Sequence, residues 1–297
     1  MKSLITTCCL IFAVFSCAQR VHTQTTTPPP TLLMFENSTR AAGLDSVTKV
    51  RDPLPVVTRN NFSLDHRTRL TLFATNMDLL PGETVSAVTA TARDSRSRNY
   101  SLKVEFLGKV PTLTSLSQLV VRLPDELAQA GEVSVSVSLH GQTSNEGLVN
   151  IEVQTQPRTV TLAARRVING HDNYVDATFS FELGMNGDVA ELLTRNDWDL
   201  QFGNNPNLDT FNVSMVGDDR SRIQDMGTLN WGDAFQVPVL TPHPVPAIEP
   251  EVITVVGHMY VVHTKDTETD LYALFRVEAL DPGKSVTISW KSVQSPE

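Results

Sequence analysis

The sequence predicts an all-β protein built of two antiparallel β-sandwich modules. Apolar and polar residues alternate from about residue 55 onward, and in the segment 133–139 valines and a leucine alternate with serines. Such an alternation places one face of a strand in a core and the other face in water. Glycine, proline and asparagine separate the alternating segments at short intervals, which is typical of turns between short strands. Only two short helices are indicated, so strands dominate the prediction.

The first predicted module spans residues 51–153 and contains about seven strands. They cover residues 55–59, 70–74, 86–92, 102–106, 119–123, 133–139 and 149–153. This number and spacing of strands is typical of an immunoglobulin-like sandwich. One short helix is predicted at Asp125–Gln129, with Asp125 as its N-cap and Gly131 as its stop.

A short polar linker leads into a second predicted all-β module at residues 158–292. Its strands are expected at residues 160–164, 175–183, 211–215, 251–264, 270–278 and 286–290. The segment Glu251–Thr264 is apolar on both faces, which favours a central strand, and it is expected to form a hairpin with Asp270–Glu278. One helix is predicted at Val189–Arg195, because Asp188 begins a sequence that resembles a capping box.

Several segments resemble modules of bacterial envelope proteins. The first module resembles their Ig-like, IPT/TIG-type modules at Arg69–Asn76, Val104–Pro111, Val121–Leu127 and Gly141–Asn145. The first strand of such modules commonly ends in glycine where this chain has Asn76, and asparagine tolerates left-handed backbone better than most residues. The stretch 257–291 resembles a C-terminal module of similar secreted bacterial proteins. These resemblances imply a fold, an exported location and a role as spacer or binding unit, without catalytic residues.

The N-terminus predicts export from the cytoplasm. Lys2 is the only charged residue before Arg20, and an apolar run from Leu4 to Phe15 is followed by small residues up to Ala18. This order is typical of a secretory signal peptide, which is predicted at residues 1–18. The apolar run is shorter than the roughly 20 residues that a membrane-spanning helix needs.

A second interpretation of the same N-terminus is a lipoprotein signal. The sequence Val14–Cys17 approximates a bacterial lipobox, which would leave Cys17 lipidated at the mature N-terminus. Residues 19–50 are expected to form a Thr/Pro-rich tether and N-terminal extension in either case. The run QTTTPPPT at residues 24–31 favours an extended polyproline II conformation over packing.

The composition narrows the classes of function. All three cysteines, at positions 8, 9 and 17, lie in the predicted signal region, so the exported body is expected to fold without disulfides. The chain has 24 Lys and Arg against 33 Asp and Glu, a formal net charge of -9, and it has no block of basic residues. Nucleic-acid binding that depends on neutralising phosphates is therefore not expected.

The chain contains no recognisable catalytic or cofactor motif. A G-x-S-x-G elbow, an H-E-x-x-H helix, a Walker loop and a G-x-G-x-x-G loop are all absent from the sequence. His258 and His263 lie five residues apart on a predicted strand, so they point to opposite faces and do not form one zinc site. Asp266, Glu268 and Asp270 offer oxygen ligands of the kind that calcium requires, although acidic residues also solvate tight turns. No metal or cofactor is predicted.

The strongest candidate for a ligand site lies in the second module around Trp198. Asp197 and Asp199 flank this tryptophan, and Asn204 and Asn205 follow in a segment rich in Asn, Gly and Pro. A planar aromatic face bracketed by amide and carboxylate groups suits a sugar, because the polar groups can bind its hydroxyls. The other interpretation is that the indole plugs one end of the sandwich while the neighbouring residues supply turns.

These observations favour a non-catalytic interaction or structural protein that is secreted, periplasmic or on the cell surface. Its expected partner is an envelope or extracellular protein or a glycan, and membrane association is expected only if Cys17 is lipidated. A glycan-binding protein that uses the loop around Trp198 is the first alternative. A carbohydrate-active or other secreted enzyme is the second alternative, and it would need two carboxylates that converge in one cleft.

Overall fold

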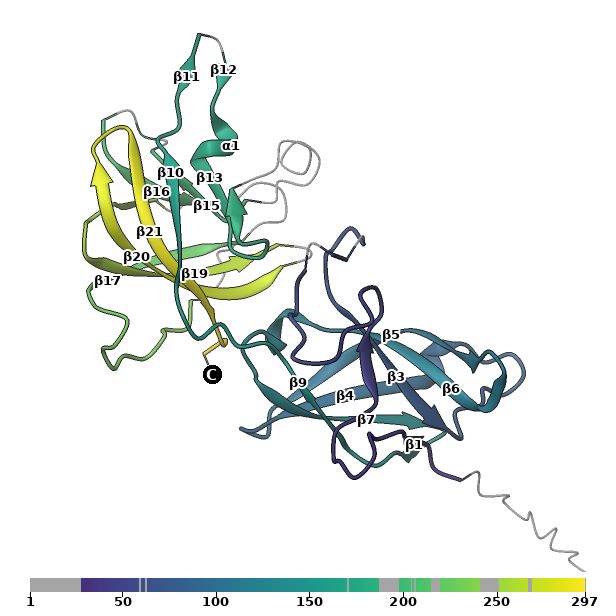
Figure 1. Ribbon diagram of the computed structural model, residues 1–297. Coiled ribbons are helices and arrows are strands. Elements are labelled where there is room, and N and C mark those ends of the chain that lie inside the picture. The colour runs from purple at the N-terminus through teal and green to yellow at the C-terminus, as the bar shows by residue number, and fades with distance from the viewer. Residues whose placement is uncertain are drawn as a thin grey trace, which may run out of the picture.

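The computed structural model describes residues 28–296, except 59, 62, 170, 187–197, 204, 206, 215–219, 241–250 and 267–268. Nearly all of its regular structure is antiparallel strand, and the strands form two sandwich-like modules that meet at a narrow junction (Figure 1). The all-β prediction is confirmed. The helices among the described residues are single turns, much shorter than a segment that crosses a bilayer.

The first module is one antiparallel sheet that curls over its own core. Its strands are β1 (Thr31–Leu32), β2 (Gly43–Asp45), β3 (Arg69–Thr75), β4 (Val88–Asp94), β5 (Asn99–Val110), β6 (Leu113–Arg122), β7 (Glu132–Leu139), β8 (Gln142–Thr143) and β9 (Gly147–Asn150). Their order is β1-β3-β6-β5-β4-β7-β8, with β2 also paired to β3 and β9 to β7. Residues 99–102 of β5 pair with β4 and residues 103–110 pair with β6, with a register shift between Val104 and Phe106. Because such a bulge bends a strand, β5 takes part in both layers.

The core of the first module is aliphatic and follows the predicted alternation. Val133, Val135 and Val137 are buried in β7, whereas the serines between them face outward and are only partly covered. Asn76, which follows β3, has a φ of 56°. Asparagine accommodates this left-handed conformation better than most residues.

The first module begins earlier in the chain than the sequence predicted. Leu32 and Ala41 belong to its core, and β1 and β2 both pair with β3. The assignment of all of residues 19–50 to a tether and extension is therefore wrong for residues 31–45. That prediction followed the Thr/Pro composition of residues 24–31, and it gave too little weight to the apolar residues that follow.

Two local predictions in the first module need correction. The predicted helix Asp125–Gln129 is a single 3-10 turn, η2 (Asp125–Leu127), and its N-cap is Pro124 rather than Asp125. The Asp125 side chain is used elsewhere, as described below. The predicted strand at residues 55–59 is reduced to isolated bridges of Leu54 with Ile151 and of Val57 with Arg67.

The second module packs two sheets face to face. One sheet has the order β10 (Arg158–Ala163), β21 (Ser285–Val293), β20 (Asp270–Asp281), β19 (His258–Lys265) and β17 (Arg222–Thr228). The other has the order β14 (Met185–Asn186), β13 (Thr178–Ser180), β15 (Leu200–Phe202), β16 (Thr210–Val213) and β18 (Glu251–Ile253). A hairpin of β11 (Val167–Ile168) and β12 (His171–Asp172) projects from the module, followed by the one-turn helix α1 (Tyr174–Ala177) (Figure 1).

Strand β19 is an inner strand with both faces buried, as the apolar sequence predicted. Tyr260 and Val262 face the core between the two sheets. Met259 and Val261 face the opposite way, where the segment 229–240 covers them with Trp231, Phe235 and other apolar side chains. The predicted strand 251–264 is nevertheless divided, because Glu251–Ile253 forms β18 in the other sheet. The predicted helix Val189–Arg195 lies outside the described residues.

Candidate functional site at the junction of the modules

The proposed sugar-stacking residue is buried. Trp198 is 5% exposed, and its ring makes an edge contact with Tyr174 at a centroid distance of 6.0 Å. An indole without an exposed face cannot stack on a sugar ring, so the prediction of a stacking surface at Trp198 is wrong. The indole instead packs within the module, because burying a large aromatic surface is favourable.

The two described polar residues of the predicted sugar site, Asp199 and Asn205, make contacts within the protein. Asp199 is buried, and its Oδ2 accepts a hydrogen bond from the Phe181 N–H at 2.6 Å. The Oδ1 of Asn205 accepts from the Asn207 N–H at 3.0 Å, which is a turn contact. Asp197, Asn204 and the predicted lipidation site Cys17 lie outside the described residues.

The acidic turn between β19 and β20 is held by contacts within the protein. The Asp266 carboxylate accepts from the Thr269 N–H, and Asp270 forms ion pairs with His263 and Lys265. Glu268 lies outside the described residues. Within the described part of the chain, no three or more His, Cys, Asp or Glu side chains are arranged to hold a metal ion.

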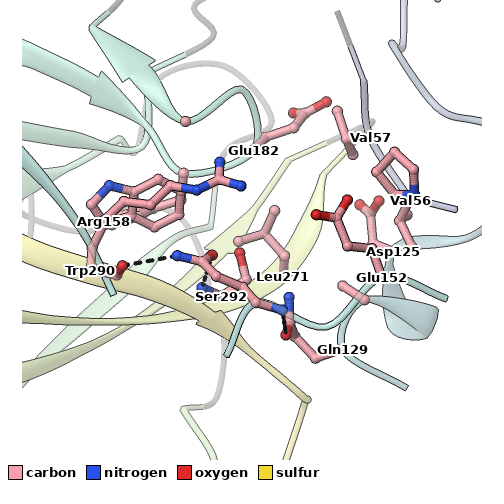
Figure 2. A pocket seen from close by; sticks show the side chains of 15 residues that line it. Val56, Val57, Asp125, Gln129, Glu152, Arg158, Glu182, Leu271, Trp290 and Ser292 are labelled. Atoms are coloured by element: carbon pink, nitrogen blue, oxygen red, sulfur yellow. Dashed lines mark hydrogen bonds between the residues drawn. The ribbon is translucent and has the colours of Figure 1, made fainter. Parts of the chain in front are cut away.

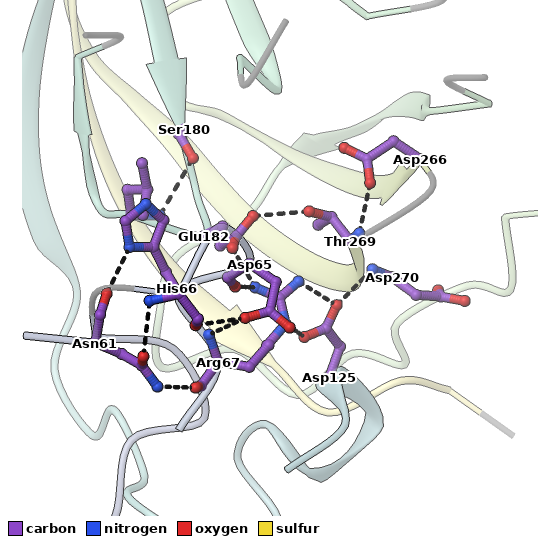
Figure 3. Close-up of polar contacts among 12 residues, drawn as sticks. Asn61, Asp65, His66, Arg67, Asp125, Ser180, Glu182, Asp266, Thr269 and Asp270 are labelled. Atoms are coloured by element: carbon purple, nitrogen blue, oxygen red, sulfur yellow. Dashed lines mark hydrogen bonds and ion pairs between the residues drawn. The ribbon is translucent and has the colours of Figure 1, made fainter. Parts of the chain in front are cut away.

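The densest polar cluster lies at the junction of the two modules and centres on Arg67 (Figure 3). Arg67 lies two residues before β3 and is 2% exposed. Asp125 reaches it from η2 of the first module, and Glu182 reaches it from the end of β13 in the second module. We call these three residues the junction triad. They converge because η2 and the turns after β13 and β19 all face the start of β3.

Within and around the junction triad, protein donors bind oxygens of both carboxylates. The Arg67 Nη2 donates to Asp125 Oδ2 at 2.8 Å, and its Nε lies 2.5 Å from Asp125 Oδ1 without hydrogen-bond alignment. The Arg67 Nη1 donates to Glu182 Oε1. Thr269 Oγ1 donates to Glu182 Oε2 at 2.7 Å, and the Asp270 N–H donates to Asp125 Oδ2 at 2.7 Å. Both carboxyl groups are therefore already bound by protein groups.

Burial shifts the protonation of the triad. Removal from water raises the pKa of the Asp125 carboxyl to about 7, and the charge of Glu182 acts in the same direction while the Arg67 guanidinium opposes them. Burial alone would lower the pKa of Arg67, but the charges of Glu182 and Asp125 hold it above its ordinary value. One cation thus faces two acids, and the proton that balances them belongs to the cluster as a whole.

Two small cavities flank the triad. One, of about 110 Å³, lies between the linker and the second module, where Asp125, Glu182, Arg158 and Trp290 line it (Figure 2). The Arg158 guanidinium carbon lies 5.9 Å from the centroid of the Trp290 ring. The other, of about 200 Å³, is lined by residues that include Arg67 and Lys265. Both are smaller than the roughly 300–1,000 Å³ of a typical ligand pocket.

A second set of contacts joins the modules through the linker and the C-terminal tail. Gln154 of the linker donates through Nε2 to the Trp290 carbonyl at 3.1 Å, and its Oε1 accepts from the Ser292 N–H at 3.2 Å. Beyond β21, Gln294 Nε2 donates to Asp94 Oδ2 at 3.3 Å, and Arg98 Nη1 donates to the Ser295 carbonyl at 3.3 Å. The tail of the second module therefore returns to the first module.

Sequence reasoning missed the junction triad. Glu182 continues the polar side of an alternating strand, which indicates a solvent-facing side chain, and Asp125 has the position expected of a helix cap. Arg67 stands in the charged run Asp65–Arg69, which favours an exposed loop. A single sequence carries no signal that these three side chains meet.

The chain shows no significant similarity to any protein-family profile or to any curated protein with which it was compared.

Proposed function

We propose that the chain is a non-catalytic structural or interaction protein of the cell exterior, in which two β-sandwich modules act as one unit. The observation that carries the proposal is that the carboxyl groups at the junction are bound by other groups of the protein. Asp125 and Glu182 are two carboxyl groups that converge at the junction, yet both are bound by Arg67 and by donors of Thr269 and Asp270 at the turn before β20.

A buried arginine that bridges acids from two modules supports a fastening role. A glycosidase acid or base must face its substrate and exchange a proton with it. The acids of the triad are instead held by short contacts in a junction whose cavities are small. Removing one partner of such a buried cluster leaves an uncompensated charge, which is costly, so the cluster favours one relative placement of the modules.

The sequence supports placement outside the cytoplasm. The predicted signal peptide at residues 1–18 contains all three cysteines, and the two cores form without disulfides. The partner that we propose is an envelope or extracellular protein or a glycan. After the burial of Trp198, no described residue singles out a glycan over a protein.

The proposal is tested by cross-linking on intact cells that produce the full chain. An amine-reactive cross-linker that does not cross membranes should link the chain to envelope or extracellular components, and mass spectrometry should show an N-terminus at Gln19 or a lipidated Cys17. Recovery of an unprocessed chain that the reagent does not reach would contradict the external location. Turnover of a glycoside or ester substrate that is lost in Asp125→Asn would contradict the non-catalytic role.

A further inference from the structure

The junction triad is electrically unbalanced. It contains one guanidinium, from Arg67, and two carboxyl groups, from Asp125 and Glu182, and these come from opposite sides of the junction. The side chains of Arg67 and Asp125 are 2% and 6% exposed, and that of Glu182 is 14% exposed. A cluster with both acids ionised therefore carries an uncompensated negative charge away from water, which is unfavourable.

We propose that the junction is a proton-dependent clasp, which closes the two modules when the triad holds a proton and releases them as the pH rises. The inference rests on the proposed function, because it assumes that the two modules act as one unit. The clasp differs from a permanent salt bridge, since its closed form needs one acid to be neutral while the other pairs with Arg67.

The groups that surround the triad do not supply the missing positive charge. On the first-module side, Arg69 and Arg122 form ion pairs with Asp65 and are therefore already used. Glu126 adds a further negative charge near Asp125. On the second-module side, Lys265 forms an ion pair with Asp270. Asp266 is a further acid on that side.

His263 is the remaining titratable group near the junction. It pairs with Asp270 and contacts the Leu240 carbonyl, while burial lowers its pKa. Asp199 is buried nearby, and its carboxylate accepts a hydrogen bond from the Phe181 N–H. Arg158 lines one of the flanking cavities together with Asp125 and Glu182, but its guanidinium lies near the Trp290 ring, 5.9 Å from the ring centroid.

The direction of the pH effect follows from linkage. When the modules separate, the Asp125 carboxyl meets water and its pKa returns towards about 4. In the closed form, burial and the neighbouring acid raise the pKa of Asp125 to about 7. The closed form therefore binds more protons between these two pKa values, so closure is favoured most below about pH 4 and this advantage is lost as the pH rises to 7. The ratio of closed to open molecules should fall by up to about tenfold for each pH unit between about 4 and 7 and should level off above 7.

The release is expected to be a hinge motion rather than dissociation. The covalent linker remains, and the contacts of Gln154 with Trp290 and of Gln294 with Asp94 also join the modules without using the side chains of the triad. Opening at the triad would widen the two flanking cavities on that side. Acids from both modules would then face each other across water, which keeps the junction open at high pH.

The test is energy transfer between dyes on the two modules. The three native cysteines lie at positions 8, 9 and 17, so they are replaced by serine in the full chain and new cysteines are placed at the exposed positions Ser115→Cys and Thr159→Cys. Transfer should be highest near pH 4, should fall as the pH rises to 7, and should change little from pH 7 to 8. Constant transfer from pH 4 to 8, or a fall on acidification, would overturn the clasp.

Two variants separate the clasp from a general effect of pH. Asp125→Asn and Glu182→Gln each remove one acid, so either should keep the modules closed from pH 4 to 8. If one variant fails to fold, the other, from the opposite module, carries the test. Glu146→Gln is the matched control, because Glu146 makes an exposed pair with Arg93, and it should keep the profile of the unmodified chain.

The outcomes also distinguish the clasp from the proposed function. Low energy transfer at every pH, including pH 4, would show that the modules do not act as one unit, and both proposals would fail. High transfer that does not respond to pH would overturn the clasp alone and would leave the two-module unit intact.

Discussion

The two modules differ in what fills their cores. The buried core of the first is aliphatic, with leucine, valine and alanine in alternating positions and Tyr100 only at its edge. The core of the second contains seven aromatic side chains, namely Phe179, Phe181, Phe202, Phe211, Tyr260, Phe275 and Trp290. Small aliphatic side chains each contribute a similar, modest share of burial, whereas large rings concentrate the packing at a few positions. A single substitution should therefore weaken the second module more than the first.

Phe275 should give the largest effect, because its ring connects both sheets of the second module. It stacks on Tyr260 at a centroid distance of 4.9 Å and makes an edge contact with Phe211, also at 4.9 Å. Phe275→Ala is expected to lower the free energy of unfolding by about 3–5 kcal/mol. Denaturant titration with amide exchange should locate the loss in residues 158–293. The conservative variant Phe275→Leu should lose much less, and an equal loss in both variants would argue against the ring contacts.

Val135 tests the aliphatic core with a smaller change. Val135 is 1% exposed and lies on the inner face of β7, so Val135→Ser should cost about 1–3 kcal/mol through lost burial. Ser136 faces outward on the same strand, and Ser136→Val should be nearly neutral. The free energy of unfolding of both variants is the measurement. If their costs were exchanged, the register of β7 would be opposite to the one observed.

Acid should weaken the first module through Asp94. Burial opposes ionisation of this carboxyl, but hydrogen bonds from the Arg98 backbone and side chain and from the Tyr100 hydroxyl lower its pKa to about 2. The stabilisation is therefore present above an ordinary pKa of about 4 and is lost as the pH falls towards 2. Thermal unfolding of the first module between pH 5 and 2 should show this loss, and Asp94→Asn should flatten it.

The second module should respond in the opposite direction through Asp199. Burial raises the pKa of this carboxyl well above its ordinary value, and the charges of Glu182 and Asp266 act in the same sense. The folded module thus keeps a proton that the unfolded chain releases, so its stability is greatest at low pH and declines as the pH rises. Asp199→Asn should remove that decline in the second module while leaving the acid response of the first unchanged. A decline that persists in Asp199→Asn would place the titrating group elsewhere.

The exposed pair of Arg93 and Glu146 should give the smallest effect. Both side chains are about half exposed, and such pairs contribute little because water and salt screen them. Arg93→Ala should change the free energy of unfolding by less than about 0.5 kcal/mol in denaturant titrations. A loss above 1 kcal/mol would mean that the aliphatic module depends on its surface charges as well as on its core.

The sequence predicted the fold better than it predicted the site, because the fold follows from local patterns whereas the site joins residues that are far apart in the sequence. The alternation in β7 is local, so it identified the buried valines correctly. The apolar faces of residues 258–265 likewise identified an inner strand. Arg67, in contrast, pairs with residues 58 and 115 positions away, and no local pattern marks such partners. The prediction of a sugar-stacking surface at Trp198 was wrong for a related reason. A sequence shows which side chains are planar or polar, but it does not show which of them are buried in the fold.

The returning tail changes how a pulling force would pass through the molecule. The chain enters the first module at β1, on the side away from the second module, whereas the C-terminus lies at the junction, where Gln294 and Ser295 bond to the first module (Figure 1). Tension applied between the two ends would therefore run across the first module and enter the tail directly. The second module would stay outside the line of force until those bonds broke. Its aromatic core would then be shielded from mechanical load by a few hydrogen bonds that yield first.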